Sequence, residues 1–213
     1  EAFVPTTTGD YLGGGVSLVG VNEGSITNIV DESGGIIQLL TDVGDDDSEW
    51  LAAGVFVPAD GGMWLEARFK IPTSVAATRE AVFCGFAETF SFSTPVMPAE
   101  RATATTTYNA GGHIGVLFDG DSTLLEFFLV AGDGSAALAT VDKNGAVGAA
   151  NGIKLTGAAG IPGGTILTAD RWYIVRVEIG VDGIGRVYFG DYDGGTSLTK
   201  KLLYVGRNTT ALG

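Results

Sequence analysis

ADRWYIVRVEIGVDGIGRVYFGDYDG, residues 169–194, is the stretch that decides the fold, because it contains the clearest β-hairpin pattern in the chain. Side chains along a β-strand alternate between two faces. One face of the first strand carries Tyr173, Val175, Val177, Ile179 and Val181. The other face carries Ile174, Arg176 and Glu178, and on the second strand Val187 and Phe189 alternate with Arg186 and Tyr188. The stretch therefore predicts two paired strands that bury one face.

The register of this hairpin follows from its faces, because directly opposed residues lie on the same side of a sheet. A two-residue turn at 182–183 would set Ile179 opposite an arginine. A three-residue loop at 181–183, with its glycine at positive φ, instead sets Val177 opposite Val187 and pairs a glutamate with an arginine on the outer face. We therefore predict the three-residue loop.

Composition limits the classes of protein to which the chain can belong. Hydrophobic residues make up 45% of the chain and charged residues only 17%, so it can bury its own core as a large β domain. The formal net charge is −13, and the sequence contains no run of basic residues. Nucleic-acid backbones and anionic membrane surfaces are bound by such runs, and no apolar stretch reaches the about 18 residues that a membrane span needs. We expect neither nucleic acid nor membrane as a partner.

Turn residues divide most of the chain into short apolar or alternating runs. Predicted strands lie at about 25–30, 36–41, 50–58, 63–72, 81–90, 113–119, 123–130, 137–142, 153–155 and 202–205. This pattern predicts an all-β, two-sheet antiparallel sandwich with little or no helix. The near-continuous apolarity of 81–90 predicts a central strand. We expect residues 1–24 to form an N-terminal arm or loose strand, and 25–213 a single β-sandwich domain.

Several blocks taken in order resemble one family. They are GGIIQLL, WLEARFKI, VFCGFAET, GGHIGVLFDGDSTLLEFFLV and LTADRWYIVRVEIGVDGIGRVYFGD, which together span about residues 34–205. Their succession resembles the concanavalin A-like (laminin-G-like) jelly rolls in structural proteins of tailed-phage virions. The resemblance implies a two-sheet jelly roll and a place on a capsid or tail, often as a decoration protein that cements capsomers. In such proteins another strand usually follows the hairpin and its partner, whereas this chain stops at Gly213 in RNTTALG. If that final strand is absent, we expect an open sheet edge near the hairpin that another subunit could cover.

An enzyme on the same fold would need specific chemistry. Glycoside hydrolysis requires two carboxylates roughly 5–10 Å apart, and the chain has no tight strand pattern of carboxylates. Glu66 shares a face with Arg68 and is interpreted as an ion-pair partner, while Glu126 stands alone among apolar residues. The only histidine, His113, follows two glycines and is interpreted as structural. The only cysteine, Cys84, lies in an apolar run and is interpreted as a buried, inert thiol. We predict that the protein is not an enzyme.

Acidic loops leave calcium open as an alternative, although we predict no cofactor. Oxygen ligands from loops suit Ca²⁺, but Asp and Gly are also the residues that turns require. Turn formation or solubilising charge is the favoured interpretation. The candidates lie in three loops: Asp45, Asp46 and Asp47; Asp119 and Asp121; Asp191 and Asp193.

Aromatic residues offer a surface site. Trp50, Trp64, Trp172 and Tyr188 are candidates, and Trp64 and Tyr188 have the parity of outward-facing positions. An outward aromatic residue serves either as a platform for a glycan or as a buried anchor in a protein contact. Protein contact is favoured.

The resemblance and the absence of a catalytic pattern lead to one hypothesis. We expect a non-enzymatic structural protein of a bacteriophage virion, a capsid decoration or cement protein on the capsid surface. Its partners would be the major capsid protein or other virion proteins, and it would form a homo-oligomer. The N-terminal arm and the aperiodic segment 91–112 are expected to make contacts. The alternative is a carbohydrate-binding, lectin-like module on the virion surface or tail.

Overall fold

Antiparallel β-sheets make up the regular structure of the described chain, which contains no helix and confirms the all-β prediction. The computed structural model describes residues 11–13, 16–21, 25–29, 36–40, 48–53, 61–70, 81–88, 96–109, 111–119, 127–134, 136–142, 144–148, 152–155, 172–192, 203–209 and 212. The chain divides into two compact units, Glu1–Phe56 with Phe90–Val96, and Val57–Thr89 with Met97–Gly213. The boundary that we predicted between residues 24 and 25 falls inside the first unit.

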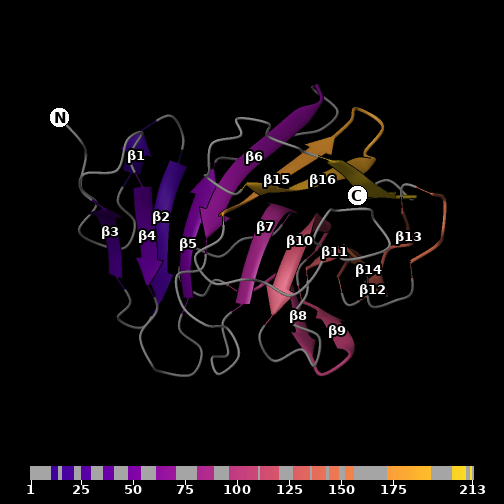
Figure 1. Cartoon of the computed structure of the whole chain (residues 1–213), viewed down its shortest axis with the longest axis horizontal. Coiled ribbons are helices and arrows are strands. Elements are labelled where there is room, and N and C mark those ends of the chain that lie inside the picture. The colour runs from indigo at the N-terminus through magenta and orange to yellow at the C-terminus, as the bar shows by residue number, and fades with distance from the viewer. Residues whose placement is uncertain are drawn as a thin grey trace. The chain divides into compact units, whose positions relative to one another are not determined.

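The first unit contains two small sheets (Figure 1). A three-stranded sheet joins β1 (Tyr11–Gly13), β2 (Val16–Val21) and β5 (Ser48–Ala53) in that order. A hairpin joins β3 (Ser25–Ile29) and β4 (Ile36–Leu40). Both strands of that hairpin were predicted from their apolar runs. The apolar alternation of Val16–Val21 is a paired strand, aligned with β5 along its whole length.

The second unit is a sandwich of two antiparallel sheets (Figure 1). Sheet I has the order β13 (Thr140–Asp142), β17 (Leu203–Asn208), β16 (Gly185–Tyr192), β15 (Trp172–Ile179) and β6 (Met63–Lys70). Sheet II has the order β12 (Ala136–Ala137), β11 (Phe128–Asp133), β10 (His113–Asp119) and β7 (Ala81–Ala87), and β14 (Ile153–Lys154) also pairs with β11.

The β15–β16 hairpin lies inside sheet I with its predicted register. Val177 pairs with Val187, and Ile179 pairs with Gly185 rather than with an arginine. Gly183 has a φ of +69°, and the amide of Gly180 donates to the carbonyl of Ile184, which closes the three-residue loop. The alternating pattern therefore predicted both the faces and the loop correctly.

The main core lies between the two sheets, where each fully buried large side chain contributes roughly 1.5–3 kcal/mol. Phe127 is its centre, because its ring lies within 6.0 Å (centroid to centroid) of four other aromatic rings: Phe69, Phe118, Tyr173 and Phe189. The inward valines of the hairpin, Val175, Val177 and Val187, are fully buried against it. The apolar face predicted for the hairpin therefore packs into the main core.

A second, smaller core lies on the other side of sheet II. A hairpin of β8 (Ala99–Ala102) and β9 (Thr105–Tyr108) covers that side, and Ala99 and Tyr108 pack with Leu117, Phe128 and Val130. We expected 91–112 to be aperiodic, but β8 and β9 alternate between buried and exposed residues. The buried positions include Arg101 and Thr106, so this alternation does not appear as a hydropathy pattern in the sequence. Residues 91–95 and 110 lie outside the described residues.

Three further expectations are corrected by the sheet order. Among the described strands β7 pairs only with β10 and ends its sheet; its continuous apolarity reflects cores on both faces rather than a central position. The single strand expected at 137–142 is two strands, β12 in sheet II and β13 in sheet I. The edge expected to be open beside the hairpin is covered, since β17 pairs with β16 and β13 pairs with β17.

Candidate functional site

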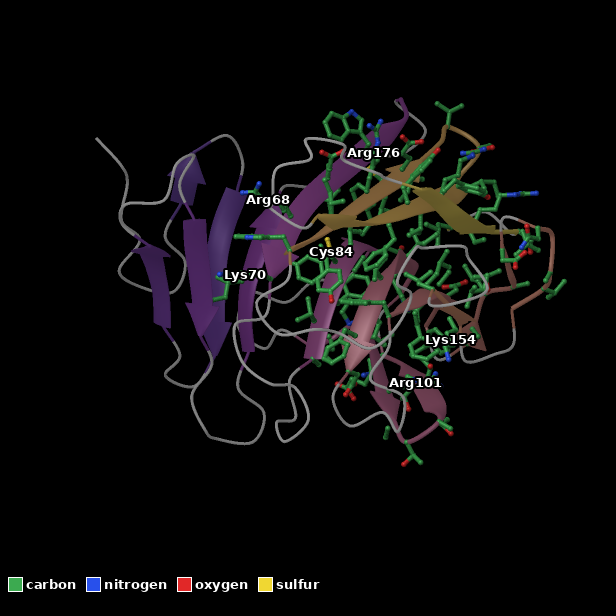
Figure 2. All side chains as sticks on the ribbon, viewed as in Figure 1. Arg68, Lys70, Cys84, Arg101, Lys154 and Arg176 are labelled. Atoms are coloured by element: carbon green, nitrogen blue, oxygen red, sulfur yellow. The ribbon has the colours of Figure 1, made fainter. Side chains whose placement is uncertain are left out.

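The candidate site is the outer face of sheet I, the side turned away from the main core. Strand β6 contributes Trp64, Glu66, Arg68 and Lys70, and β15 contributes Trp172, Ile174, Arg176 and Glu178. Strands β16 and β17 contribute Arg186, Tyr188, Tyr204 and Arg207. Figure 2 shows Arg176 on this side of the sheet, with Arg101 and Lys154 on the far side of the sandwich. Cross-strand pairing thus gathers residues that are far apart in the sequence.

Trp64 is the most exposed aromatic side chain of the described chain, with 63% of its surface accessible. Its position is nevertheless defined by neighbours. The guanidinium carbon of Arg176 lies 4.9 Å from the Trp64 ring centroid, a cation–π contact. Arg176 Nη2 also lies 2.7 Å from Glu178 Oε1, and Glu178 pairs with Trp64 across the strands. Trp64 is therefore an exposed but ordered ring.

Tyr188 is held by the Glu178 carboxylate, which also contacts Arg176. Its hydroxyl donates to Glu178 Oε2 at 3.2 Å, and its ring makes an edge contact with Tyr204 at 5.5 Å between centroids. Partial burial raises the pKa of Tyr188, and the neighbouring Glu178 carboxylate raises it further. The phenol stays protonated at neutral pH and keeps this hydrogen bond. Glu178 therefore fixes both Arg176 and Tyr188, and we name Trp64, Arg176, Glu178, Tyr188 and Tyr204 the Trp64 cluster.

Trp172 organises a second group on the outer face. The guanidinium carbon of Arg68 lies 4.5 Å from the Trp172 ring centroid, and Lys70 Nζ lies 5.5 Å from it. Figure 2 shows Arg68 and Lys70 together at one end of β6. Ile174, which we placed on the outer face, is only 4% exposed and lies between the two groups. The face therefore consists of two aromatic and cationic clusters rather than one continuous platform.

Asp182 stabilises the hairpin loop next to the Trp64 cluster. Its Oδ1 accepts the backbone N–H of Ile184 at 3.0 Å, and Arg186 Nη2 lies 3.5 Å from its Oδ2. The Ile184 hydrogen bond, with the nearby Arg186 charge, lowers the pKa of Asp182. This aspartate shapes a turn, as turn-forming aspartates were expected to do.

Of the calcium candidates, only Asp119 has a described side chain. Asp119 is buried, and its Oδ2 accepts the backbone N–H of Arg101 at 2.7 Å, which ties the β8–β9 hairpin to sheet II. Asp191 lies on β16, and its side chain is outside the described structure, as are residues 45–47, 121 and 193. Among the described residues, no group of three or more His, Cys, Asp or Glu could hold a metal ion.

The structure describes three of the residues considered as catalytic candidates, His113, Cys84 and Glu66. His113 is fully buried, stacks on Tyr108 at 5.6 Å between ring centroids, and its Nδ1 lies 2.9 Å from the carbonyl oxygen of Gly111. Cys84 packs against the main core, and burial raises the pKa of its thiol to about 12. Glu66 lies on the outer face opposite Arg176, and Glu126 is outside the described residues.

Two other sequence features find a place in the structure. Asn208 of the Asn-Thr-Thr sequon is fully buried, and its Oδ1 accepts the Gly185 amide at 2.6 Å. This buried amide is part of the contact between β17 and β16. Trp50 lies on β5, but its side chain is outside the described structure.

Part of the site was missed in the sequence. Trp64 and Tyr188 were identified by parity, but Tyr204 and Arg207 were not. Strand β17 runs three residues beyond its predicted end, and the register between β16 and β17 shifts at Val187 and Tyr188. A β-bulge breaks simple alternation, so counting by two cannot place both Tyr204 and Arg207 on one face.

Comparison with models of protein families, with curated proteins and with solved structures finds no match to the chain. None of the described elements is a helix with the length and apolarity needed to cross a membrane.

Proposed function

We propose that the chain is a non-enzymatic structural protein of a virion, a capsid decoration protein that binds a neighbouring subunit through the outer face of sheet I. One observation supports the proposal above the others. Trp64 is 63% exposed, yet Arg176 and Glu178 hold its surroundings in place. Trp, Tyr and Arg are the residues that dominate binding energy in protein interfaces. An ordered anchor loses little conformational freedom when it is buried by a partner.

The architecture is compatible with this role. The two antiparallel sheets are the arrangement expected for the jelly roll of concanavalin A-like phage proteins, and we propose that fold family for the second unit. The β8–β9 hairpin, which was expected to reach a partner, packs on its own sheet through Tyr108 and Ala99. The outer face therefore replaces that segment as the proposed contact surface. The predicted homo-oligomer and capsid location belong to the same proposal.

The experiment removes the gene from the virus that encodes the chain. Purified particles without the protein are expected to lose infectivity and release their genome at a lower temperature than complete particles. Adding purified protein should restore the original temperature. Particles of equal heat stability with and without the protein, and no rebinding in co-sedimentation, would refute the proposal.

Carbohydrate binding is the second candidate, because exposed Trp64 could also stack on a sugar ring. The surroundings favour the protein contact. The Tyr188 hydroxyl already donates to Glu178, and the Tyr188 ring is covered at its edge by Tyr204. A glycan array probed with the wild-type chain and with Trp64→Ala separates the two functions. Glycan binding that disappears in Trp64→Ala would establish the sugar site.

A further inference from the structure

The outer face of sheet I differs in charge from the rest of the chain. The chain has 12 basic and 25 acidic residues. Five of the basic residues lie on this face: Arg68, Lys70, Arg176, Arg186 and Arg207. Among the described residues, the acidic ones on this face are Glu66 and Glu178, with Asp182 at the adjoining loop. Basic residues therefore outnumber acidic ones here, although the whole chain is strongly acidic.

The local charge, rather than the net charge, governs contacts at this face. At physiological ionic strength the Debye length is about 8 Å, so charges elsewhere on the molecule are largely screened from a partner that touches the sheet. The basic groups are also held in place by aromatic rings. Arg68 and Lys70 lie over Trp172, and Arg176 lies over Trp64. These ring contacts fix where the cations lie on the face.

The composition of the face selects the class of partner. A second copy presenting the same face would bring like charges together, which opposes a symmetric contact. The phosphate backbone of duplex DNA would meet Glu66 and Glu178 as well as the cations. Two tryptophans, two tyrosines and four arginines on one face of a sheet are instead typical of a protein interface.

We propose that the outer face of sheet I binds an acidic surface of another protein. This partner chemistry rests on the proposed function, because it specifies the neighbouring subunit that the decoration protein would contact. Arg176 and Arg68 would pair with carboxylates of the partner, while Trp64 is buried by its apolar side chains. In the free chain, Arg176 Nη2 lies 2.7 Å from Glu178 Oε1. A carboxylate of the partner would compete with Glu178 for this guanidinium, so the contact requires Glu178 to share or release Arg176.

The test uses the full chain and two synthetic peptides. One peptide alternates Glu with Tyr, and its matched control alternates Gln with Tyr. Titrations are followed through tryptophan fluorescence and the indole N–H resonances in NMR spectra. We expect the Glu peptide to bind at least about tenfold more tightly than the Gln peptide, with the difference shrinking as salt increases. Arg176→Glu should weaken binding about tenfold or more.

The control variant is Lys154→Glu, which makes the same charge change on β14 of sheet II and should leave affinity within about twofold. Equal binding of the two peptides would overturn the inference. So would tighter binding of a sulfated oligosaccharide than of the Glu peptide at the same face, or a dimer that Trp64→Ala dissociates.

The two proposals fail in different ways. If particles bind Arg176→Glu as well as wild type but not Trp64→Ala, the acidic partner is wrong and the decoration role stands. If the Glu peptide binds as expected but particles without the protein do not take it up, the acidic-surface contact stands and the decoration role fails.

Discussion

Arg101 shows how a charged residue is accommodated inside the second unit. It is 4% exposed, and its guanidinium carbon lies 3.8 Å from the Phe128 ring centroid. Its Nη1 donates to Thr106 Oγ1 at 2.9 Å, and its Nη2 donates to the carbonyl oxygen of Ala104 at 3.1 Å. A buried charge without such partners would cost several kcal/mol. Arg101 therefore fastens the β8–β9 hairpin to sheet II.

Replacing Arg101 is expected to loosen this hairpin. Arg101→Ala removes the stacking contact and leaves buried hydrogen-bond acceptors without their donor, which should cost about 3 kcal/mol of unfolding free energy. Urea denaturation measures the change. Arg207→Ala, an exposed arginine on sheet I, is the control and should change stability by less than about 0.5 kcal/mol. Equal losses for the two variants would show that Arg101 is not held as described.

Cys84 makes a prediction about alkaline pH. Burial raises the pKa of the Cys84 thiol from 9.0 to about 12, so between these values the folded chain keeps a proton that the unfolded chain releases. The unfolding free energy must therefore fall as pH rises through this window, by at most about 4 kcal/mol for this group. Tyr108, whose pKa burial also raises to about 12, adds to the same slope.

The check on Cys84 is a pair of urea titrations across pH 9–12. Cys84→Ala should show a shallower loss of stability than the wild type, while the part due to Tyr108 remains. The native thiol should also react with Ellman's reagent far more slowly than the unfolded chain does. Rapid labelling of the folded protein, or identical pH slopes for the two chains, would contradict the buried thiol.

At the scale of the element, the β15–β16 hairpin was predicted almost completely from its sequence. Each face has a distinct composition, so only one register keeps apolar residues together and sets Glu178 opposite Arg186. The β8–β9 hairpin was missed because its buried positions include the polar residues Arg101 and Thr106, so burial does not follow hydropathy along these strands. Local patterns also say nothing of distant partners, such as β6 beside β15 or β13 beside β17. The same limit applies to the candidate site.

The loop of this hairpin depends on one glycine. Gly183→Ala places a Cβ at a φ of +69°, where L-residues other than glycine are strained, and should cost about 1 kcal/mol. Gly62→Ala is the matched control because a Cβ there has ordinary contact distances, the nearest being 3.4 Å to the carbonyl oxygen of Ile179. Thermal unfolding should show a lower Tm only for the first variant. A similar loss of Tm for Gly62→Ala would show that the positive φ of Gly183 is not the cause of the destabilisation.

At the scale of the whole molecule, the distribution of charge carries more information than the net charge. The sequence has no basic run, and its net charge of −13 argues against anionic partners. The fold nevertheless collects Arg68, Arg176 and Arg207 from three strands onto one face. Linear inspection identified Trp64, Tyr188, Arg176 and Arg186 as outward residues, but only strand pairing between distant segments places them on one surface with Arg68 and Arg207.

The central claim is that the Trp64 cluster binds a neighbouring subunit, and the dissociation constant of the chain for particles that lack it tests this claim most directly. Trp64→Ala should weaken binding by about 2 kcal/mol or more, a factor of roughly 30, without lowering the Tm of the free chain. The control is Lys154→Ala, which truncates an exposed side chain on β14 of sheet II and should bind like the wild type. Wild-type affinity for Trp64→Ala would contradict the account.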